Sequence, residues 1–540
     1  MPHSRLDTTK LFDRLSWALL AALAAIVALT FRHYGVAWDE PVQHVYGKMA
    51  LDYYLTLGAD TTSFRYINLH WYGALFDMLI ALAIKVSPLW EYDTRHLLSG
   101  LIGVTGVAGT WRLGRALGGP RAGFLAALLL ALTPAWHGAA FINPKDVPFA
   151  AALAWAALFL VRIARALPQW RWRDFVGFAF AAGPALGIRV GGLIALAYLV
   201  ATLGMHAVLS LLDRESLASV LRRLARLIAP ALGAVVLALL IMYLAWPWAQ
   251  SKPIAGPLEA FRSFARFPIE FDYPFFGRII NSTTVPWYYE PAMMAVMLPE
   301  LAVVAAGASA VLALAALFRR PEGGWKATLP CLVLAMLILF PLAYAPLEGA
   351  VLFDGMRHML FVVPPIVAAA ALALERLARA GAAGRGAATA LAIVTAANQA
   401  VVMARAHPYQ YAVYNSFVGG VAGADGRFEL DYWGLAFREA VEAMHARLVE
   451  DGEAPTRERQ WRVTVCGPEQ SAALFFPPDY VLVPWQDIAR SDFFISNTRY
   501  QCRPGETLKS TPVFVDVRRF GVVLARVYDL RASPGRAISP

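Results

Sequence analysis

One pattern repeats along most of the chain: an apolar segment long enough to cross a bilayer, followed by a short turn that carries Arg and Lys. A transmembrane helix needs about 20 mostly apolar residues. Such segments begin near residues 15, 96, 122, 147, 174, 190, 227, 291, 327, 357 and 386. The pattern therefore predicts an all-α polytopic membrane protein with about eleven transmembrane helices.

The composition agrees with a membrane protein. Hydrophobic residues make up 58% of the chain and charged residues only 16%, whereas soluble proteins carry about 25% charged residues. The 48 Lys and Arg outnumber the 38 Asp and Glu, for a formal net charge of +10. These basic residues lie between apolar segments and not along one polar face. They indicate turns that face anionic lipid, and they argue against nucleic-acid binding.

The basic turns also predict an orientation, because cytoplasmic turns carry an excess of Lys and Arg. We expect the N-terminus in the cytoplasm and the C-terminus in the periplasm, with the chain in a bacterial inner membrane. The first apolar segment, Leu15–Thr30, is interpreted as a span and not as a cleavable signal, since no small-residue cleavage site follows it. The clusters expected on the cytoplasmic side are Arg112/Arg115/Arg121, Arg162/Arg165/Arg171/Arg173, Arg214/Arg222/Arg223/Arg226, Arg319/Arg320/Lys326 and Arg376/Arg379/Arg385.

The apolar segment Trp71–Val86 does not fit this alternation. Counted as a span, it would place every basic cluster on the outer side. A short juxtamembrane helix at the outer interface is the simpler interpretation.

The outer side then collects the long polar stretches. A membrane domain is predicted over residues 1–405, with outer loops at 32–95, 136–146, 248–290 and 346–356. The tail, residues 406–540, has strand-forming runs at Trp461–Val465 and Val513–Val517 and a helical stretch at about 434–450. It predicts a small C-terminal α/β periplasmic domain. Cys466 and Cys502 lie in it, and an oxidising compartment would allow them to pair, although spacing alone does not decide this.

Acidic residues gather at the outer ends of the spans. Asp39 and Glu40 follow the first span, and Lys145 and Asp146 close the second outer loop. Carboxylates at the lipid–water boundary suit a reaction there, in which one acid accepts a proton from a hydroxyl and others orient the acceptor. Each acid also has a simpler interpretation: a surface or helix-capping carboxylate for Asp39, and a helix N-cap for Asp146.

Several motifs together resemble a known superfamily. They are the acidic pair after the first span, the long first outer loop with an amphipathic helix, the run Arg95-His96-Leu97-Leu98-Ser99-Gly100-Leu101 opening the next span, and Gly114-Arg115 through Pro120-Arg121-Ala122-Gly123 at its inner turn. The pattern resembles the GT-C glycosyltransferases, and within them the branch of protein O-mannosyltransferases and lipid A aminoarabinose transferases. The similarity covers roughly residues 10–200 with motifs, and extends as a hydropathy pattern to about 405.

The resemblance implies an enzyme that takes a sugar from a polyprenyl-phosphate-linked donor and passes it to a periplasmic or lipid-linked acceptor hydroxyl, with inversion at the anomeric carbon. It implies that Asp39, with Glu40 beside it, and Asp146 are the catalytic carboxylates, the first as general base. The donor is a substrate; no other cofactor is implied. The partners are membrane lipids, the lipid-linked donor, and a glycan, lipid or protein acceptor. Whether Lys145 contacts the donor phosphate or neutralises Asp146 stays open.

The leaving phosphate calls for basic side chains near the outer leaflet, and arginine suits it best because its planar guanidinium makes two parallel contacts. Arg189 and Arg357 open spans on the outer side, with His358 next to the second. Snorkelling to the interface, or a pair with Asp354, would also explain Arg357. Candidates for binding acceptor or sugar are Tyr288, Tyr289, His407 and Asp431, although aromatic anchoring and a packed linker explain them equally.

No metal site is predicted, because His44, His70 and His137 lie in separate segments without ligand spacing. Two other classes stay open. A lipid or polysaccharide transporter would need an acid-lined central cavity, whereas the spans contain few acids. A non-catalytic scaffold would tolerate exchange of Asp39 and Asp146.

Overall fold

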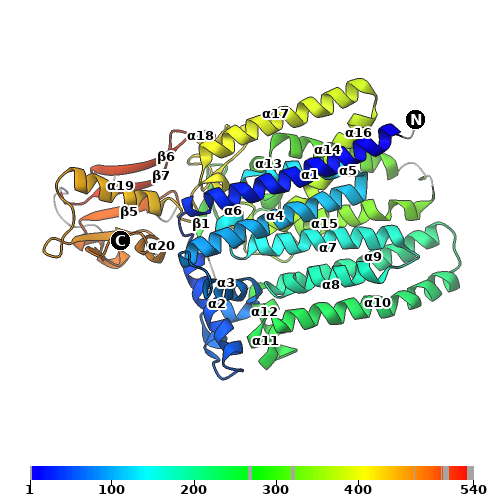
Figure 1. The fold of residues 1–540 in the computed structure, drawn as a ribbon, viewed down its shortest axis with the longest axis horizontal. Helices are drawn as coiled ribbons and strands as arrows, with labels where there is room; N and C mark the ends of the chain where they lie inside the picture. Colours follow the sequence, from blue (N-terminus) through cyan, green and yellow to red (C-terminus); the bar gives the residue numbers. More distant parts are fainter. Residues whose placement is uncertain are drawn as a thin grey trace.

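The structure, a computed structural model, describes residues 3–531 except 266–269, 318–320, 322, 468, 500–501 and 503–509. Its long helices run side by side along the long axis of the molecule, and the C-terminal strands lie beyond one end of them (Figure 1). The long helices are α1 (His3–Thr30), α4 (Glu91–Gly118), α5 (Pro120–Ala131), α6 (Pro134–Ile142), α7 (Asp146–Ala166), α8 (Trp172–Leu186), α9 (Leu193–Leu212), α10 (Leu217–Leu244), α13 (Tyr289–Met297), α14 (Glu300–Leu317), α15 (Leu329–Leu347), α16 (Val363–Arg379) and α17 (Ala382–Ala406).

Among the described residues, seven helices are long and apolar enough to cross a membrane, or eight if α5 and α6 form one bent span. The prediction of a mostly helical, multi-pass membrane protein is confirmed. The remaining segments of the predicted eleven correspond to α4, α8 and the pair α13–α14, which do not meet the same criterion, so the count of eleven stays a prediction. The centre of the bundle is formed by α7 and α16, whereas α17 lies on its surface: 78% and 72% of their apolar windows are buried, against 11% for α17.

Two prolines change the expected course of the chain. Pro134 occupies the first turn of α6, which bends away from α5 by 64°. Residues 136–142 of the outer loop expected at 136–146 are helical, because the proline at the first position of Pro134–Ile142 favours a new helix. That this connection lies on the outer side stays a prediction. Pro299 likewise separates α13 from α14, where one unbroken span was expected.

The basic turns gather at the end of the bundle that holds the N-terminus, opposite the C-terminal strands (Figure 1). Ion pairs join turns that are far apart in sequence: Arg115 with Asp13 (2.8 Å), Arg121 with Glu375 (2.7 Å), and Lys326 with Glu215. The prediction that the described clusters share one side agrees with these contacts. Arg319 and Arg320 lie outside the described residues.

Short elements cover the opposite end. They are α2 (Glu40–Leu55), α3 (Leu75–Ile84), α11 (Pro247–Ser251), α12 (Ala255–Ala265) and the antiparallel pair β1 (Asp272–Phe275) and β2 (Arg278–Asn281). The ten residues of α3 extend only about 15 Å, half the apolar thickness of a bilayer. Its entry is fixed by a close backbone approach, since a Cβ at Gly73 would lie 2.0 Å from the Gly187 carbonyl oxygen. The interpretation of Trp71–Val86 as a helix that does not span agrees with this geometry.

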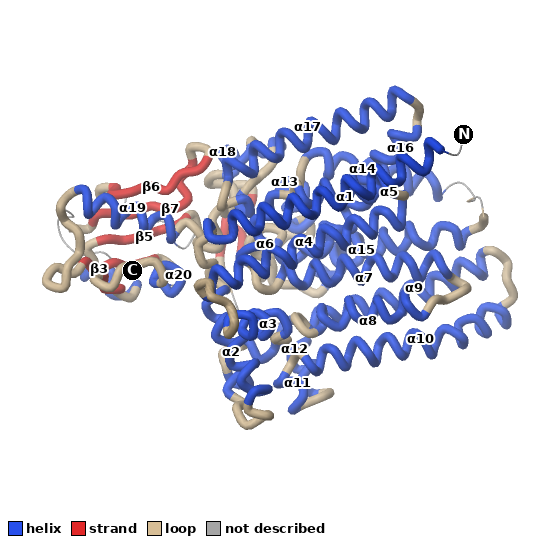
Figure 2. The backbone as a smooth tube through the Cα atoms, in the orientation of Figure 1, coloured by secondary structure: helices blue, strands red, loops and turns tan. Residues whose placement is uncertain are grey.

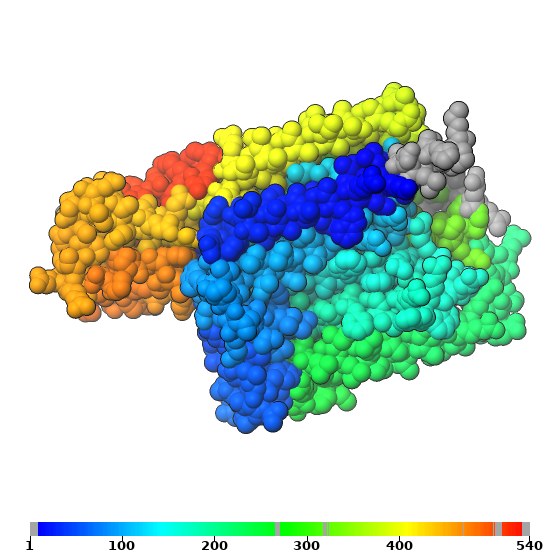
Figure 3. All heavy atoms as spheres, in the orientation of Figure 1, coloured from blue at the N-terminus to red at the C-terminus, as the bar shows by residue number. Residues whose placement is uncertain are grey.

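The tail forms a five-stranded sheet of order β4-β3-β5-β7-β6, seen as the strands at one end in Figure 2. The β3 strand is parallel to β4 and β5, and β7 is antiparallel to β5 and β6. Figure 3 shows these residues projecting from the bundle, and we call residues 437–531 the C-terminal lobe. Its elements are α19 (Phe437–Glu450), β3 (Trp461–Val465), α20 (Glu469–Ala473), β4 (Tyr480–Leu482), β5 (Phe493–Asn497), β6 (Val513–Arg519) and β7 (Val522–Asp529).

The cysteine question left open by the spacing is answered here. Cys466 follows β3 and Cys502 follows β5, and the parallel pairing of these strands brings their ends together. The two residues form a disulfide, with their Cα atoms 5.5 Å apart.

Candidate active site

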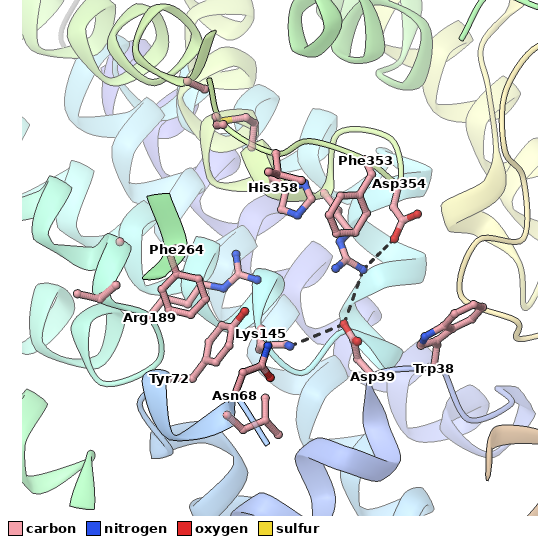
Figure 4. Close-up of a pocket in the computed structure, with 18 of the residues that line it drawn as sticks. Trp38, Asp39, Asn68, Tyr72, Lys145, Arg189, Phe264, Phe353, Asp354 and His358 are labelled. Atoms are coloured by element: carbon pink, nitrogen blue, oxygen red, sulfur yellow. Dashed lines mark ion pairs between the residues drawn. The ribbon is translucent and has the colours of Figure 1, made fainter. Parts of the chain in front are cut away.

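A cavity of about 730 Å³ lies where the short elements and the C-terminal lobe meet the bundle. Its polar side chains come from connections that are far apart in sequence: Asp39 before α2, Lys145 before α7, Arg189 after α8, and Arg357 ahead of α16. Figure 4 shows Lys145 and Asp39 pointing toward one another, with Arg189, His358 and Asp354 around them. The helix ends nearest the C-terminal lobe thus supply one charged pocket.

Asp39 is placed by the start of α2. Its carbonyl accepts a hydrogen bond from the amide of Gln43 (3.2 Å), and the amide of Trp38 donates to the carbonyl of Trp433 (3.1 Å). The Asp39 side chain keeps 26% exposure and forms two long ion pairs, 3.8 Å to Lys145 and 3.6 Å to Arg357. It makes no capping hydrogen bond to α2, so the capping interpretation does not account for it.

Asp146 is the first residue of α7 and is only 4% exposed. Asn143 holds it from behind: its Oδ1 accepts from the Asp146 amide (2.7 Å) and its Nδ2 donates to Asp146 Oδ2 (2.6 Å). The other oxygen faces Arg189 Nη2 at 2.7 Å. Asn143, and not Asp146, accepts the amide hydrogen bonds at the start of α7 that an N-cap residue would accept. The Asp146 carboxylate is therefore free to face the basic side chains.

Arg357 is placed by a tight turn. Asp354 (φ +58°) and Gly355 (φ +69°) both have left-handed backbone conformations, and Arg357 then begins the 3-10 segment η6 (Arg357–Val362). Its guanidinium reaches Asp354 at 3.2 Å, Asp39 at 3.6 Å and Asp146 at 3.9 Å. With 11% exposure, it does not snorkel to the interface. It lies among three carboxylates instead.

The charges set the protonation states of the acids outside the spans. Burial alone would raise the pKa of Asp39, but Lys145, Arg357, Arg189 and Arg499 together lower the pKa below its usual value. Asp354 differs: burial raises its pKa despite the neighbouring Arg499 and Arg357. Asp39 is therefore ionised at neutral pH and faces the open part of the cavity.

One wall of the cavity is apolar. It comprises Val190, Phe261, Phe264, Tyr344 and Val351, from η4 (Val190–Gly192), α12, the end of α15 and the loop after it. Phe261 and Tyr344 are exposed at its mouth. A pocket that is charged on one side and apolar on the other matches a ligand with an anionic head and a hydrocarbon chain.

The structure brings Asp39, Lys145, Arg189, Arg357 and His358 together as cavity-lining residues, with Asp146 directly behind them. His358 packs against Phe353.

Five other predicted site residues do not line this cavity: Glu40, Tyr288, Tyr289, His407 and Asp431. Glu40 is buried against His96 (3.0 Å). Tyr288 packs on Phe275, and the Tyr289 hydroxyl donates to the Gly355 carbonyl (3.3 Å).

His407 and Asp431 also have partners elsewhere. His407 contacts His33 (2.8 Å between ring nitrogens), at the junction of α1 and α17, and burial lowers its pKa to about 4. Asp431 accepts hydrogen bonds from the Tyr411 hydroxyl and from the amides of Leu435 (2.9 Å) and Ala436 (3.0 Å). These contacts are those of residues that fix the connection between the bundle and the lobe.

Tyr72, Trp433 and Arg499 are among the lining residues that the sequence did not point to. Tyr72 lies beneath both Lys145 and Arg189, whose cationic groups are 4.7 and 5.9 Å from its ring centre. Trp433 and Arg499 come from the tail. The aromatic pair ahead of Gly73 could have indicated Tyr72, but nothing in the tail's pattern shows that Arg499 reaches the first outer loop.

Within the described ranges, no group of three or more His, Cys, Asp or Glu side chains is arranged to hold a metal ion.

Comparison with known proteins gives a family match and a fold match. The sequence model of the dolichyl-phosphate-mannose-protein mannosyltransferase family matches residues 75–248, less than half of the chain. No curated protein sequence matches significantly. ArnT from Cupriavidus metallidurans in the apo state is 15% identical, with a TM-score of 0.50 over 95% of this chain and 97% of that chain.

Two further solved structures are similar at lower TM-scores. ArnT from the same organism bound to undecaprenyl phosphate is 15% identical, with a TM-score of 0.47 over 96% of this chain and 98% of that one. The archaeal oligosaccharyltransferase AglB from Archaeoglobus fulgidus, in complex with an inhibitory peptide and a dolichol-phosphate, is 12% identical, with a TM-score of 0.49 over 89% and 69%. The match to the mannosyltransferase family over residues 75–248 and the shared fold of apo ArnT agree with the resemblance to the GT-C glycosyltransferases.

Proposed function

We propose that this chain transfers a glycosyl group from a polyprenyl-phosphate-linked donor to the hydroxyl of a periplasmic or lipid-linked acceptor. The observation that carries the proposal is the two-sided cavity: an apolar wall open at its mouth, facing a group of basic side chains around the ionised Asp39. A polyprenyl phosphate has the same two-sided character. The family match supports a glycosyltransferase independently of this geometry.

The donor lies with its hydrocarbon chain against Val190, Phe261 and Tyr344 and its phosphate beside Arg357 and Arg189. Arginine favours such a site because its guanidinium contacts two phosphate oxygens at once and stays charged. Lys145 adds a third cation at the same end, and His358 lines the wall beside Arg357. These charges stabilise the polyprenyl phosphate as it leaves.

In the proposed reaction, Asp39 accepts the proton of the acceptor hydroxyl while the acceptor oxygen forms a bond to the anomeric carbon of the sugar. The bond between that carbon and the phosphate oxygen breaks, and its electron pair leaves with the polyprenyl phosphate. Attack opposite the leaving group inverts the anomeric configuration. Asp146 holds Arg189 and Arg357 in place for the phosphate, with ion pairs of 2.7 and 3.9 Å.

The proposal includes a place in the cell. The residues that line the cavity lie at the end of the bundle opposite the basic turns, and the positive-inside rule supports an outer position for that end. The proposed membrane is a bacterial inner membrane. Residues 1–405 then hold the catalytic transmembrane domain and residues 406–540 a periplasmic domain.

Two measurements test the function. Undecaprenyl phosphate, used as a probe of the purified full-length protein, should bind the wild type and raise its thermal unfolding temperature. Mass spectrometry of cell-envelope lipids and glycans should show a sugar modification that depends on the wild-type gene and disappears with the Asp39→Asn variant. A modification that persists with Asp39→Asn would remove Asp39 from the base role, and no binding of the probe would remove the proposed donor.

The orientation is tested separately by labelling single cysteines in intact cells with an impermeant thiol reagent. Cys331 is free and exposed, so the background is Cys331→Ala. Arg165→Cys should be protected and Glu453→Cys should react. The reverse result would place the cavity on the cytoplasmic side.

A further inference from the structure

The C-terminal lobe contributes one arginine to the cavity. Arg499 follows strand β5 by two residues and is 6% exposed. Its guanidinium lies over the ring of Trp38 at 4.4 Å and near that of Phe271 at 5.0 Å, and Nη1 donates to the carbonyl of Tyr432 at 2.6 Å. Stacking on two rings together with a hydrogen bond to the main chain holds this guanidinium in one orientation.

The segment that carries Arg499 is itself anchored. Asn497 Oδ1 accepts from the Arg499 amide (3.1 Å), and the amide of Cys502 donates to the Arg499 carbonyl (2.8 Å). Cys502 is joined to Cys466. Next to that partner, Gly467 has φ +102° and lies so close to Trp38 that a Cβ there would be 3.0 Å from the ring. Gly467, next to Cys466, and Arg499, three residues before Cys502, therefore both contact Trp38, the residue that precedes Asp39.

Arg499 and Arg357 share one carboxylate. Arg499 Nη2 is 3.2 Å from Oδ1 of Asp354, and Arg357 Nη1 is 3.2 Å from Oδ2 of the same group. Asp354 is almost fully buried, so water does not compete for it. Each arginine thus holds one oxygen, and neither forms the two-pronged pair that arginine and carboxylate prefer.

We propose that Arg499 is a positioning residue for the donor site: by holding one oxygen of Asp354, it keeps Arg357 from closing a two-pronged pair with that carboxylate and leaves its guanidinium directed at the donor phosphate. The inference rests on the proposed function. Arg499 is not itself the phosphate ligand, because its guanidinium is already engaged by two rings, a carbonyl and Asp354.

The charges of the cavity support this arrangement. Lys145, Arg189, Arg357 and Arg499 form ion pairs with three carboxylates, those of Asp39, Asp146 and Asp354, and Glu348 also lines the cavity. Without Arg499, Asp354 has both oxygens available to Arg357, and the positive charge left for an anionic head falls. If Asp354 is also replaced by the neutral Asn, Arg357 has no carboxylate there with which to form a two-pronged pair. Its guanidinium is then available to the phosphate again.

The test is a double-mutant cycle on the full-length protein, with undecaprenyl phosphate as the binding probe. Arg499→Gln should weaken probe binding about tenfold, the loss of roughly one charge-assisted contact. Asp354→Asn in the same chain should restore most of that loss, although it adds no group that binds phosphate. Arg499→Lys, which keeps a charge beside Asp354, should bind better than Arg499→Gln. Arg462→Gln, an exposed arginine of the same lobe, is the matched control and should bind as the wild type does.

The outcomes separate the inference from the function on which it rests. Equal binding by the wild type and Arg499→Gln would overturn the inference alone. Weak binding by Arg499→Gln that Asp354→Asn does not restore, with a lower thermal unfolding temperature in both variants, would show that Arg499 only holds the lobe in place and would also overturn it. A wild type that does not bind the probe would overturn the proposed donor and the inference together.

Discussion

Two clusters of charge lie side by side at the end of the bundle that meets the C-terminal lobe, and their adjacent acids, Glu40 and Asp39, differ in burial and in how tightly they pair. The inner cluster is fully buried and comprises Glu40, Asp77, Arg95 and His96. The cavity cluster comprises Asp39, Asp146, Lys145, Arg189 and Arg357. Asp39 and Glu40 are neighbours in sequence, yet they belong to different clusters.

The inner cluster is closed. Glu40 is 1% exposed, and its carboxylate contacts His96 at 3.0 Å and Arg95 at 3.7 Å, while its Oε2 also accepts from the amide of Ala37 (2.7 Å). Arg95 in turn pairs with Asp77. In contrast, Asp39 keeps 26% exposure and no contact with a cation shorter than 3.6 Å. These long pairs leave the Asp39 carboxylate without a tight counter-ion, so its oxygens are available to a substrate hydroxyl.

Gln43 lies between the clusters. In the amide orientation that satisfies both neighbours, it donates to Asp77 (2.5 Å) and accepts from Lys145 (2.9 Å). The comparison teaches that pairing, and not residue type, separates the roles of these two acids: the short contacts of Glu40 hold the helix ends together, and the long contacts of Asp39 leave its carboxylate available for chemistry. The following changes test that distinction, from the largest expected effect to the smallest.

Asp39→Asn should reduce transfer by about 10²–10⁴-fold, the usual contribution of a general base, because an amide cannot accept the acceptor's proton. Folding should be nearly unchanged, since Asp39 has only long contacts. Transfer rate and thermal unfolding temperature are measured together. Asp52→Asn, on the same helix α2, is the matched control. Near-normal transfer by Asp39→Asn would move the base role to another carboxylate, and a large loss of stability would make Asp39 structural.

Glu40→Gln should have the opposite profile. Removing one partner of a buried ion pair costs about 3–5 kcal/mol, because Arg95 stays buried after losing one of its counter-charges. We expect a clear fall in thermal unfolding temperature, whereas protein that remains folded transfers at close to the wild-type rate. Loss of turnover in a stable Glu40→Gln protein would contradict the distinction between the clusters and return Glu40 to the catalytic group.

Arg357→Ala should weaken binding of undecaprenyl phosphate by roughly 10–100-fold, the equivalent of a charge-assisted contact of about 1.5–3 kcal/mol. Arg357→Lys should restore little of it, because an ammonium does not reproduce a planar two-pronged contact. Binding is measured on purified protein at one salt concentration. Full recovery with lysine would reduce Arg357 to a point charge.

Part of the site could be predicted because membrane topology limits where polar residues meet. Asp39, Asp146, Arg189 and Arg357 all adjoin the outer ends of apolar segments, and these ends share one surface whatever the helix packing. The sequence pattern could not separate Asp39 from Glu40, because the difference depends on which way each side chain turns as α2 begins. That direction is set by Arg95 and His96, some 55 residues later in sequence.

The acceptor candidates show a second limit. Tyr288, Asp431 and His407 lie in long connections whose length says nothing about which side chains face the cavity. Their aromatic and polar character was visible, but their partners, Phe275, Tyr411 and His33, are set by long-range packing. The place of Arg499 in the cavity could not be predicted for the same reason, because its contacts with Trp38 and Asp354 are also set by long-range packing. The strand runs of the tail could be identified from alternation, whereas their order in the sheet depends on pairings that no local pattern encodes.

The smallest expected effect concerns the pH dependence of transfer. Lys145, Arg357, Arg189 and Arg499 lower the pKa of Asp39 against the opposing effect of burial. A base must be ionised to accept a proton, so wild-type activity should persist to acidic pH and fall only as pH drops through this lowered pKa. Lys145→Gln removes one of these cations; the pKa of Asp39 then rises, and the acidic fall in kcat moves to higher pH.

The measurement is kcat against pH for both proteins, with donor at saturation so that weaker binding does not contribute. Lys85→Gln is the control, since Lys85 is exposed and does not contribute to the lowered pKa of Asp39. A uniform loss of kcat with an unmoved acidic limb would make Lys145 a phosphate contact without influence on the base. A limb that moves to lower pH would contradict Asp39 as the titrating group, because loss of a neighbouring cation cannot make a carboxyl more acidic.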